Sequence, residues 1–227
     1  MLHAFVQSKS RLYRRYLGQR EEPGERRIAA EDEITSIITG PLAYMPPAAS
    51  GAFWVALANL RNPKLVLPPG APTEVSMQFW DRNKGIEPDL RVDLGWGSER
   101  RIFLVEFKWR APLSGADQLH DQWDHYLLPD ERVRALHLFI GLDTSEGLHA
   151  LSRGDVWEGK LLLRTWCDVL TTIKGLQTGQ LPALHLWCAQ VEQFLKLLGV
   201  HRFDGFGRMT TPDIPTYSPV FFRSCDD

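Results

Sequence analysis

Residues 87–109 read EPDLRVDLGWGSERRIFLVEFKW, and this stretch decides the fold of the chain. It contains two mainly apolar runs, residues 89–96 and 102–109, joined by the short polar segment 97–100. Apolar runs of this length on either side of a Gly-containing turn are typical of a β-hairpin. We therefore expect two antiparallel strands here.

The second of these strands places two charged side chains on one face. Side chains alternate along a strand, so Glu106 and Lys108 share a face with Leu104. Burying a charge costs free energy unless the charge is paired or bound to a metal ion. A carboxylate and an amine two residues apart in so apolar a strand indicate a functional site. The alternative is a cross-strand salt bridge on an exposed face.

The pairing of the hairpin decides whether a second carboxylate joins them. If Ser98 and Glu99 form a two-residue turn, Asp89 lies opposite Lys108, and opposed residues share a face. Asp89, Glu106 and Lys108 then converge on one side of the sheet. A slip of one residue would place Asp89 on the far side, where it would be only a turn residue.

A further acid on the first strand is excluded by its distance. In the same register Asp93 faces Leu104. Asp93 also lies four residues along the strand from Asp89, which is roughly 13 Å at the usual rise. We therefore expect Asp93 to stay away from any ion that Asp89 holds.

The rest of the chain predicts helices around a sheet. Alternation predicts a strand at residues 74–80, and an apolar run predicts a central strand at 135–142. The helices that we expect are at residues 7–18, 29–44, 52–60, 116–128, 160–176 and 184–198. Helices and strands in this order are typical of an α/β domain in which helices flank a mixed β-sheet in three layers.

We predict a single domain with short extensions at both ends. The domain covers residues 29–207. An N-terminal helix and a charged loop precede it at residues 1–28, and a Pro-rich C-terminal tail follows at residues 208–227.

Two carboxylates and a lysine suit the hydrolysis of phosphodiester bonds. Mg²⁺ prefers oxygen ligands and keeps several waters, so Asp89 and Glu106 with a phosphate oxygen suffice to hold it, and Mn²⁺ is an expected substitute. The metal lowers the pKa of a bound water and stabilises the charge that develops on the phosphate. Lys108 orients or deprotonates the attacking water, or pairs with the phosphate, and the sequence leaves these roles open.

Pro88-Asp89, followed after a short hairpin by Glu106-Phe107-Lys108, resembles the motif of the PD-(D/E)xK nuclease superfamily. The resemblance covers residues 31–142, about half the chain. It implies a restriction-endonuclease-like core and a Mg²⁺-dependent nuclease that cuts DNA, with Asp89, Glu106 and Lys108 as catalytic residues. It also implies a setting such as restriction, antiviral defence or repair, and RNA is not excluded as a substrate.

The helix that follows the motif extends the resemblance. Gln118, Gln122 and Tyr126 are similar to the Gln/Tyr helix of exonuclease-type members, where this helix supports the lysine and the DNA. The alternative is that these residues form a partly exposed helix face.

The helix before the motif resembles the first helix of the fold, which often supplies a further acidic metal ligand. Glu31, Ile34, Thr35 and Ile38 share one face at helical spacing, so Glu31 lies on the apolar side that turns toward the sheet. Glu31 is therefore our first choice as a metal ligand, and Glu33 is the second. The alternative is an acidic helix start favoured by the helix dipole.

Composition limits the class of protein and its partners. With 44% hydrophobic and 24% charged residues, the chain is not of the disordered class. The formal net charge of −2 disfavours binding of nucleic acid through a diffuse positive field. It therefore favours slightly a second hypothesis, a non-cleaving nucleic-acid-binding or assembly subunit that keeps the nuclease fold.

The sequence also suggests where the protein works. It has no run of about 20 apolar residues and no secretory signal, so we expect a cytoplasmic protein without a membrane partner. The three cysteines are an odd number and lack the spacing of a structural zinc site. DNA is the expected partner, and a homodimer or a partner protein of a multi-subunit system stays open.

Overall fold

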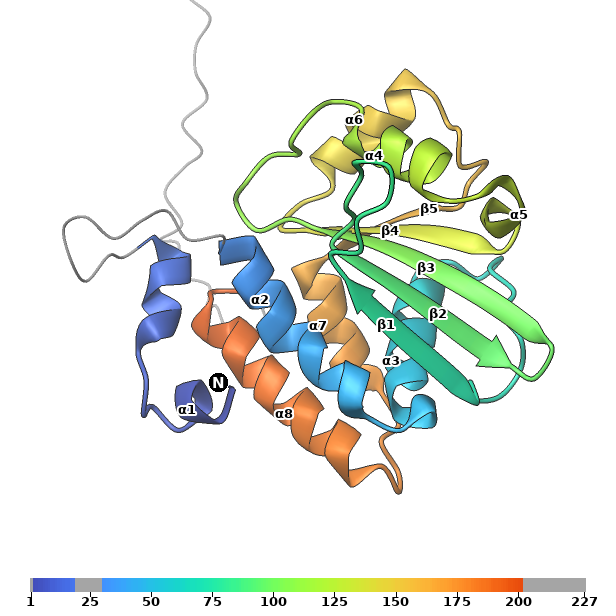
Figure 1. The fold of residues 1–227 in the computed structure, drawn as a ribbon. Helices are drawn as coiled ribbons and strands as arrows, with labels where there is room; N and C mark the ends of the chain where they lie inside the picture. The colour runs from blue at the N-terminus through green and yellow to red at the C-terminus, as the bar shows by residue number, and fades with distance from the viewer. Residues whose placement is uncertain (1, 19–29, 202–227) are drawn as a thin grey trace, which may run out of the picture.

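The computed structural model describes residues 2–18 and 30–201 of the 227-residue chain (Figure 1). The helices are α1 (Leu2–Val6), η1 (Leu12–Leu17), α2 (Ala30–Thr39), η2 (Gly40–Tyr44), α3 (Pro47–Asn59), α4 (Gln118–Asp121), η3 (Gln122–Tyr126), α5 (Pro129–Arg132), α6 (Ser145–Arg153), α7 (Trp166–Gly175) and α8 (Pro182–Leu197). The strands are β1 (Glu74–Phe79), β2 (Leu90–Trp96), β3 (Glu99–Phe107), β4 (Ala135–Gly141) and β5 (Leu161–Thr165). Most of the expected charged loop and the expected Pro-rich tail lie outside the described residues.

The five strands form one mixed sheet in the order β1-β2-β3-β4-β5. The first three strands pair antiparallel, and β3, β4 and β5 pair parallel. Strand β4 is buried along its whole length, as expected for a central strand. The sheet therefore changes from antiparallel to parallel at β3, the strand that carries Glu106.

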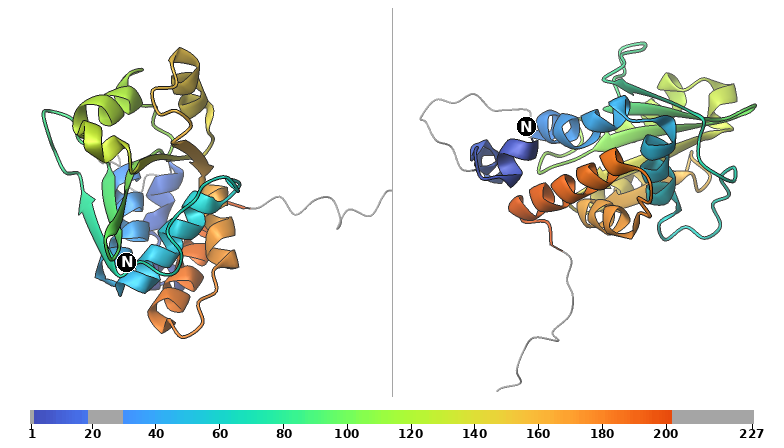
Figure 2. Two further views of the ribbon diagram at one scale, coloured as in Figure 1. Left: turned by 90° about the vertical axis from the view of Figure 1, so that its right-hand side faces the viewer. Right: turned by 90° about the horizontal axis from the view of Figure 1, so that it is seen from below.

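Helices cover both faces of the sheet (Figure 1, Figure 2). On one face, α2, α3, α7 and α8 form the larger core with Phe103 and Val105 of β3. On the other face, α4, η3 and α6 form a smaller core with Ile102 and Leu104. Side chains of β3 thus alternate between two apolar cores. These observations confirm the expected α/β fold, with a mixed sheet flanked by helices.

The turn of the β2–β3 hairpin is displaced from the expected one. The turn residues are Gly97 and Ser98, because Trp96 pairs with Glu99, so the expected turn at Ser98–Glu99 is wrong by one residue. Gly97 has a φ of +65°. Glycine in a left-handed conformation at the first central position is characteristic of a type II′ hairpin turn, and this requirement fixes the turn at Gly97.

The displaced turn moves the pairing by two residues but leaves the faces unchanged. The numbers of opposed residues sum to 195 instead of 197, and Asp93 faces Ile102 rather than Leu104. Because side chains on a strand repeat every two residues, a shift of two keeps each one on its face. Asp89 therefore stays on the same side of the sheet as Glu106.

Two sequence-based expectations about the other elements are wrong, and one helix was missed. The single helix expected at residues 7–18 is replaced by α1 and the 3-10 helix η1. The single helix expected at residues 160–176 is the strand β5 followed by α7, because short apolar runs fit a buried strand and a buried helix equally well. The amphipathic helix α6 was not expected at all.

A capping box could have marked the boundary between β5 and α7. Thr165 Oγ1 accepts a hydrogen bond from the Asp168 backbone N–H at 3.2 Å, and Asp168 Oδ2 accepts one from the Thr165 backbone N–H at 2.9 Å. This exchange satisfies donors at a helix start, so it locates the N-terminus of α7 at Thr165.

Across residues 2–18 and 30–201, none of the helices combines the length and the apolar character needed to cross a lipid bilayer.

Candidate metal centre

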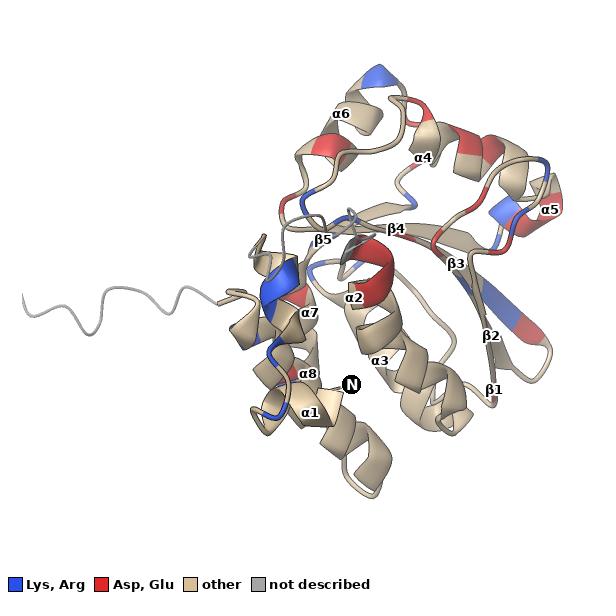
Figure 3. Ribbon diagram, turned by 60° about the vertical axis from the view of Figure 1, so that its left-hand side comes forward, with Lys and Arg blue, Asp and Glu red and all other residues tan. Residues whose placement is uncertain are grey.

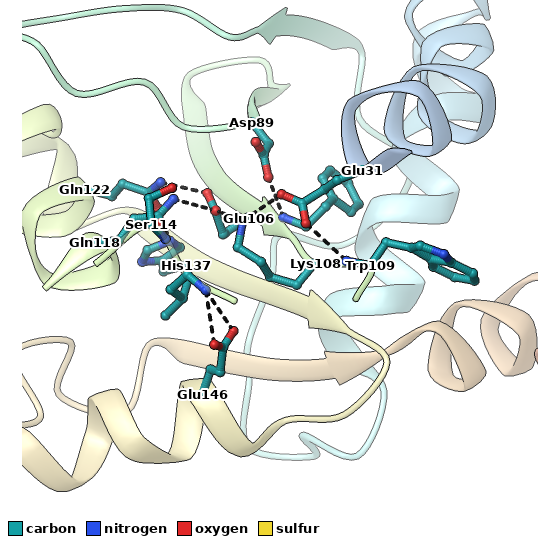
Figure 4. A network of polar contacts seen from close by, with 12 residues as sticks. Glu31, Asp89, Glu106, Lys108, Trp109, Ser114, Gln118, Gln122, His137 and Glu146 are labelled. Carbon is teal, nitrogen blue, oxygen red and sulfur yellow. Dashed lines mark hydrogen bonds and ion pairs between the residues drawn. The ribbon is translucent and has the colours of Figure 1, made fainter. Parts of the chain in front are cut away.

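The candidate site lies at the end of β3, on the sheet face covered by α4 and η3 (Figure 4). Glu106 is fully buried there, and Lys108 follows two residues later on the same face. Asp89 immediately precedes β2, and its Oδ2 accepts a hydrogen bond from the Phe107 backbone N–H at 2.7 Å. The hairpin thus brings together the three residues singled out from the sequence.

A third carboxylate arrives from the first turn of α2. Glu31 Oε1 accepts a hydrogen bond from Lys108 Nζ at 2.7 Å, and its Oε2 accepts one from the Trp109 backbone N–H at 3.1 Å. Ile34 and Ile38, which share a helix face with Glu31, are buried in the larger core. The apolar face of α2 therefore orients Glu31 toward the end of β3.

Glu33, the second choice from the sequence, points elsewhere. Its Oε2 accepts a hydrogen bond from the Tyr16 hydroxyl at 2.6 Å. Two residues along a helix correspond to a rotation of about 200°, so Glu31 and Glu33 cannot face the same site. Figure 3 shows the acidic first turn of α2 to which both belong.

The three carboxylates form a compact set of oxygen ligands. One oxygen from each of Glu31, Asp89 and Glu106 lies within 4.8 Å of the others, a spacing at which the three residues could hold a metal ion. Lys108 Nζ lies 2.6 Å from Glu106 Oε1. With all carboxylates ionised, three negative charges and one positive charge leave the cluster with a net charge of −2.

Burial makes this charge costly. Burial, and then the negative charge of Glu106, raise the pKa of Asp89 to about 8. Burial also raises the pKa of Glu106, although Lys108 opposes the change. For Lys108, burial alone would lower the pKa, but the charges and hydrogen bonds of Glu106 and Glu31 raise it above its ordinary value. A divalent cation would neutralise the excess negative charge.

Two glutamines from the covering helical segment hold the Glu106 carboxylate. Gln118 Nε2 donates to Oε1 at 2.6 Å, and Gln122 Nε2 donates to Oε2 at 2.7 Å. Between them the α-helix α4 gives way to η3, a single turn of π-helix. Such turns are frequent at functional sites. The structure therefore brings both glutamines singled out from the sequence to the acidic cluster.

Behind Gln122 lies a buried chain of hydrogen bonds that the sequence analysis missed. Trp157 Nε1–H donates to His137 Nδ1 at 3.1 Å, so the proton of the neutral imidazole is on Nε2. His137 Nε2 then donates to Gln122 Oε1 at 3.1 Å, which turns the amide nitrogen toward Glu106. Burial lowers the pKa of His137 to about 3 and keeps the ring neutral. A lone histidine in the apolar run of β4 was the available signal.

Tyr126, the third residue of the expected supporting helix, makes a different contact. Its hydroxyl donates to Asp81 Oδ2 at 2.7 Å. Asp81 belongs to the connection between β1 and β2 and is exposed. The structure thus joins Tyr126 to that connection, and the supporting contacts to Glu106 come from Gln118 and Gln122.

The carboxylates, the lysine and the two glutamines define this site by their geometry. The likeness to the PD-(D/E)xK motif rests on these same residues. No protein-family model matches the chain, and neither the curated proteins nor the solved structures compared with it give a match.

Proposed function

We propose that this protein is a Mg²⁺-dependent nuclease that hydrolyses phosphodiester bonds of DNA. One observation carries the proposal: three carboxylates, those of Glu31, Asp89 and Glu106, surround a single amine, that of Lys108, in a largely buried cluster. The likeness of this hairpin to the PD-(D/E)xK motif supports the same reaction.

The donor set fits Mg²⁺ better than a softer metal. All three candidate ligands are carboxylates, and hard oxygen ligands are those that Mg²⁺ prefers. In the described residues, the Asp89 Oδ1 atom accepts no hydrogen bond, so it is available as a ligand. When bound, the ion would lower the pKa of a water and offset negative charge on the phosphate.

The other residues hold the carboxylates in place. Gln118 and Gln122 fix both oxygens of Glu106, and the Phe107 backbone N–H fixes Asp89. Hydrogen bonds to a metal ligand orient it, and their loss typically costs about 10- to 100-fold in metal affinity or activity. The site is therefore organised before a substrate arrives.

In this proposal, Lys108 contacts the substrate. An ammonium group has three donors, and two of them are directed at Glu31 and Glu106. Among the described residues the third donor has no partner, so it would bind a phosphate oxygen or orient the attacking water. Because Lys108 is paired with two carboxylates, we assign it a role as a charged donor rather than as a base.

The second candidate function is a subunit that binds nucleic acid or assembles with a partner without cleavage. The net charge of −2 favours the assembly role, because most proteins that bind nucleic acid non-specifically are basic. The complete set of Asp89, Glu106 and Lys108 favours the nuclease.

Cleavage assays separate the two functions. Supercoiled plasmid, linear duplex, single-stranded DNA and RNA are incubated with the protein and Mg²⁺ or Mn²⁺, beside Lys108→Ala and Glu106→Ala. We expect the wild type to cut DNA and both variants to be inactive while keeping their fold by circular dichroism. Wild-type rates in either variant would refute the assignment of the site.

Asp93→Ala is the matched control for the loss of a carboxylate. Asp93 lies on the same face of β2 as Asp89, but its carboxylate pairs with Arg91, with 2.8 Å between Arg91 Nε and Asp93 Oδ2. This variant should keep measurable cleavage activity, because it removes an acid that the metal does not use.

A further inference from the structure

A cavity of about 330 Å³ opens beside the acidic cluster, outside the carboxyl ends of β3 and β4. Lys108 lines it, so the cavity adjoins the group proposed to act on phosphodiester bonds. The loop after β3 contributes Arg110, and the start of α6 contributes Ser145. Crevices beyond the carboxyl ends of strands are where open α/β sheets bind ligands.

Arg110 has an unusual backbone conformation for a residue with a side chain. Its φ is +99°, well inside the left-handed region that favours glycine. Strain of this kind persists only where the surrounding structure enforces it, and it concentrates at functional sites. A glycine would adopt this conformation without strain, so an arginine here indicates that its side chain has a function.

Contacts on both sides of Arg110 enforce the strain. On the N-terminal side, the Trp109 backbone N–H binds Glu31, and the Trp109 indole N–H donates to the Tyr16 carbonyl at 3.2 Å. On the C-terminal side, both carboxylate oxygens of Glu146 accept a hydrogen bond from the Leu113 backbone N–H, at 3.0 and 3.2 Å. The loop is thus held at both ends.

Of the two cations in the cavity lining, Lys108 and Arg110, only Arg110 lacks an ion pair to a described residue. Arg110 is exposed and forms no ion pair with any residue in the described part of the chain. The two acids in the lining accept backbone hydrogen bonds: Glu146 from the Leu113 N–H at 3.0 Å, and Asp143 from the Ser145 N–H at 2.8 Å. Lys108 is already paired with carboxylates.

We propose that Arg110 and this cavity form a phosphate subsite, which binds the phosphodiester group next to the one that is cleaved. This inference rests on the proposed nuclease function. A planar guanidinium can bind two phosphate oxygens at once, and contacts of this kind position the nucleic acid backbone rather than read its sequence. Arg110 is therefore a positioning residue for the scissile phosphate at Lys108.

The test compares Arg110→Ala with Arg110→Gly. Both remove the guanidinium, so both should weaken binding of a labelled DNA oligonucleotide in metal-free buffer by about tenfold or more, measured by fluorescence anisotropy. Only glycine relieves the backbone strain, so Arg110→Gly should melt roughly 2–4 °C above Arg110→Ala. Arg110→Lys keeps the positive charge but loses the planar group that can bind two phosphate oxygens. Its affinity for DNA should therefore lie between those of the wild type and Arg110→Ala.

The exposed turn residue Glu158 supplies the matched control. Its φ is +52°, and the residue does not line this cavity. Glu158→Gly should therefore melt above Glu158→Ala as well, but both should bind DNA as the wild type does.

A substrate analogue tests the phosphate directly. A neutral methylphosphonate is placed at the position before or after the cleaved bond. At one of these positions it should weaken wild-type binding about tenfold, yet leave the binding of Arg110→Ala unchanged, because that variant has already lost the contact.

Two failures are distinguishable. If the wild type cleaves DNA, but Arg110→Ala binds with wild-type affinity and wild-type sensitivity to the analogue, the phosphate subsite is wrong and the nuclease function stands. If the wild type neither binds nor cleaves nucleic acid, the proposed function is wrong and the subsite falls with it.

Discussion

Lys108 Nζ lies 2.7 Å from Glu31 Oε1, although 77 positions separate the two residues in the chain. The contact joins the first turn of α2 to the end of β3. The candidate metal centre is therefore not confined to the hairpin that carries the sequence motif. Its third carboxylate depends on how the helical layer packs against the sheet.

Glu31→Gln tests that dependence. The amide keeps the size of the side chain, but its single oxygen can accept only one of the two hydrogen bonds from Lys108 and Trp109. It also removes one negative charge, which relieves repulsion with Asp89 and Glu106 and offsets the lost hydrogen bond. We expect the Mg²⁺ concentration for half-maximal cleavage to rise about tenfold or more, with little change in the melting temperature. A titration of cleavage rate against Mg²⁺ measures this.

Glu33→Gln is the control for a lost charge in the same helical turn. Glu33 accepts a hydrogen bond from the Tyr16 hydroxyl, and an amide oxygen can still accept it. The Mg²⁺ dependence should stay that of the wild type. If Glu33→Gln raised the Mg²⁺ requirement and Glu31→Gln did not, the helix would supply Glu33 to the metal instead.

Asp89→Asn should change stability and metal binding in opposite directions. Burial raises the pKa of Asp89 to about 8, so this group destabilises the metal-free protein as the pH rises from 3.8 toward 8. An amide does not ionise. Metal-free Asp89→Asn should therefore melt roughly 2–4 °C or more above the wild type at pH 7, while the increase in melting temperature on adding Mg²⁺ should disappear.

The comparison uses thermal melts with EDTA and with Mg²⁺. Asp93→Asn should lose its pairing with Arg91 and keep the Mg²⁺-induced increase. An unchanged Mg²⁺ response in Asp89→Asn would mean that Asp89 is not a ligand.

Gln122→Leu should lower both the rate of cleavage and the stability of the fold. It leaves Glu106 Oε2 and His137 Nε2 without their partner in a buried environment, which costs about 1–3 kcal/mol per group. Misorientation of Glu106 should lower kcat about 10- to 100-fold. Urea denaturation and steady-state cleavage measure the two effects.

Tyr126→Phe is the companion to this variant, because Tyr126 lies in the same π-helical turn as Gln122. It removes only the hydrogen bond to Asp81, so stability should fall by about 1 kcal/mol and kcat should hold. Equal losses of kcat in both variants would argue that the whole turn, and not the amide of Gln122, matters.

His137 should make the protein sensitive to acid. Its pKa is lowered to about 3 in the folded protein, against 6.5 as its ordinary value, so the unfolded chain takes up the proton first. The stabilising effect is complete above pH 6.5 and falls by about 1.4 kcal/mol per pH unit as the pH drops toward 3. His137→Gln can still accept from Trp157 and donate to Gln122, but it does not titrate.

Urea denaturation between pH 6.5 and 4.5 compares the two proteins. The unfolding free energy of His137→Gln should fall less steeply with acid, by about 1.4 kcal/mol per pH unit. Parallel curves would show that His137 is not a buried neutral residue.

The sequence predicted the faces of side chains better than their partners. The period of two along β3 placed Glu106 and Lys108 correctly relative to Asp89 despite the displaced turn, because an even shift preserves the face. In the same way, the helical period selected Glu31 over Glu33. The strand period and the helical period are both local geometry, which a short stretch of chain determines.

Contacts between distant segments could not be predicted from the sequence. The Trp157–His137–Gln122 chain joins three elements whose packing no local pattern encodes. The helix expected at residues 160–176 is wrong because a short apolar run such as LLLRT is compatible with a buried strand and with a buried helix. Its parallel pairing with β4 makes it a strand. The strained φ of Arg110 likewise appears only when the loop is fixed at both ends.

The link between Glu31 and Lys108 has a consequence for the folding of the chain. It closes a long loop between the start of α2 and the end of β3, and the chain entropy lost on closing a loop grows with the length of the loop. A cation bound by Glu31, Asp89 and Glu106 would connect the helical layer to the sheet. Loss of the ion would therefore loosen α2 first, and activity would disappear by partial opening before the sheet itself unfolds.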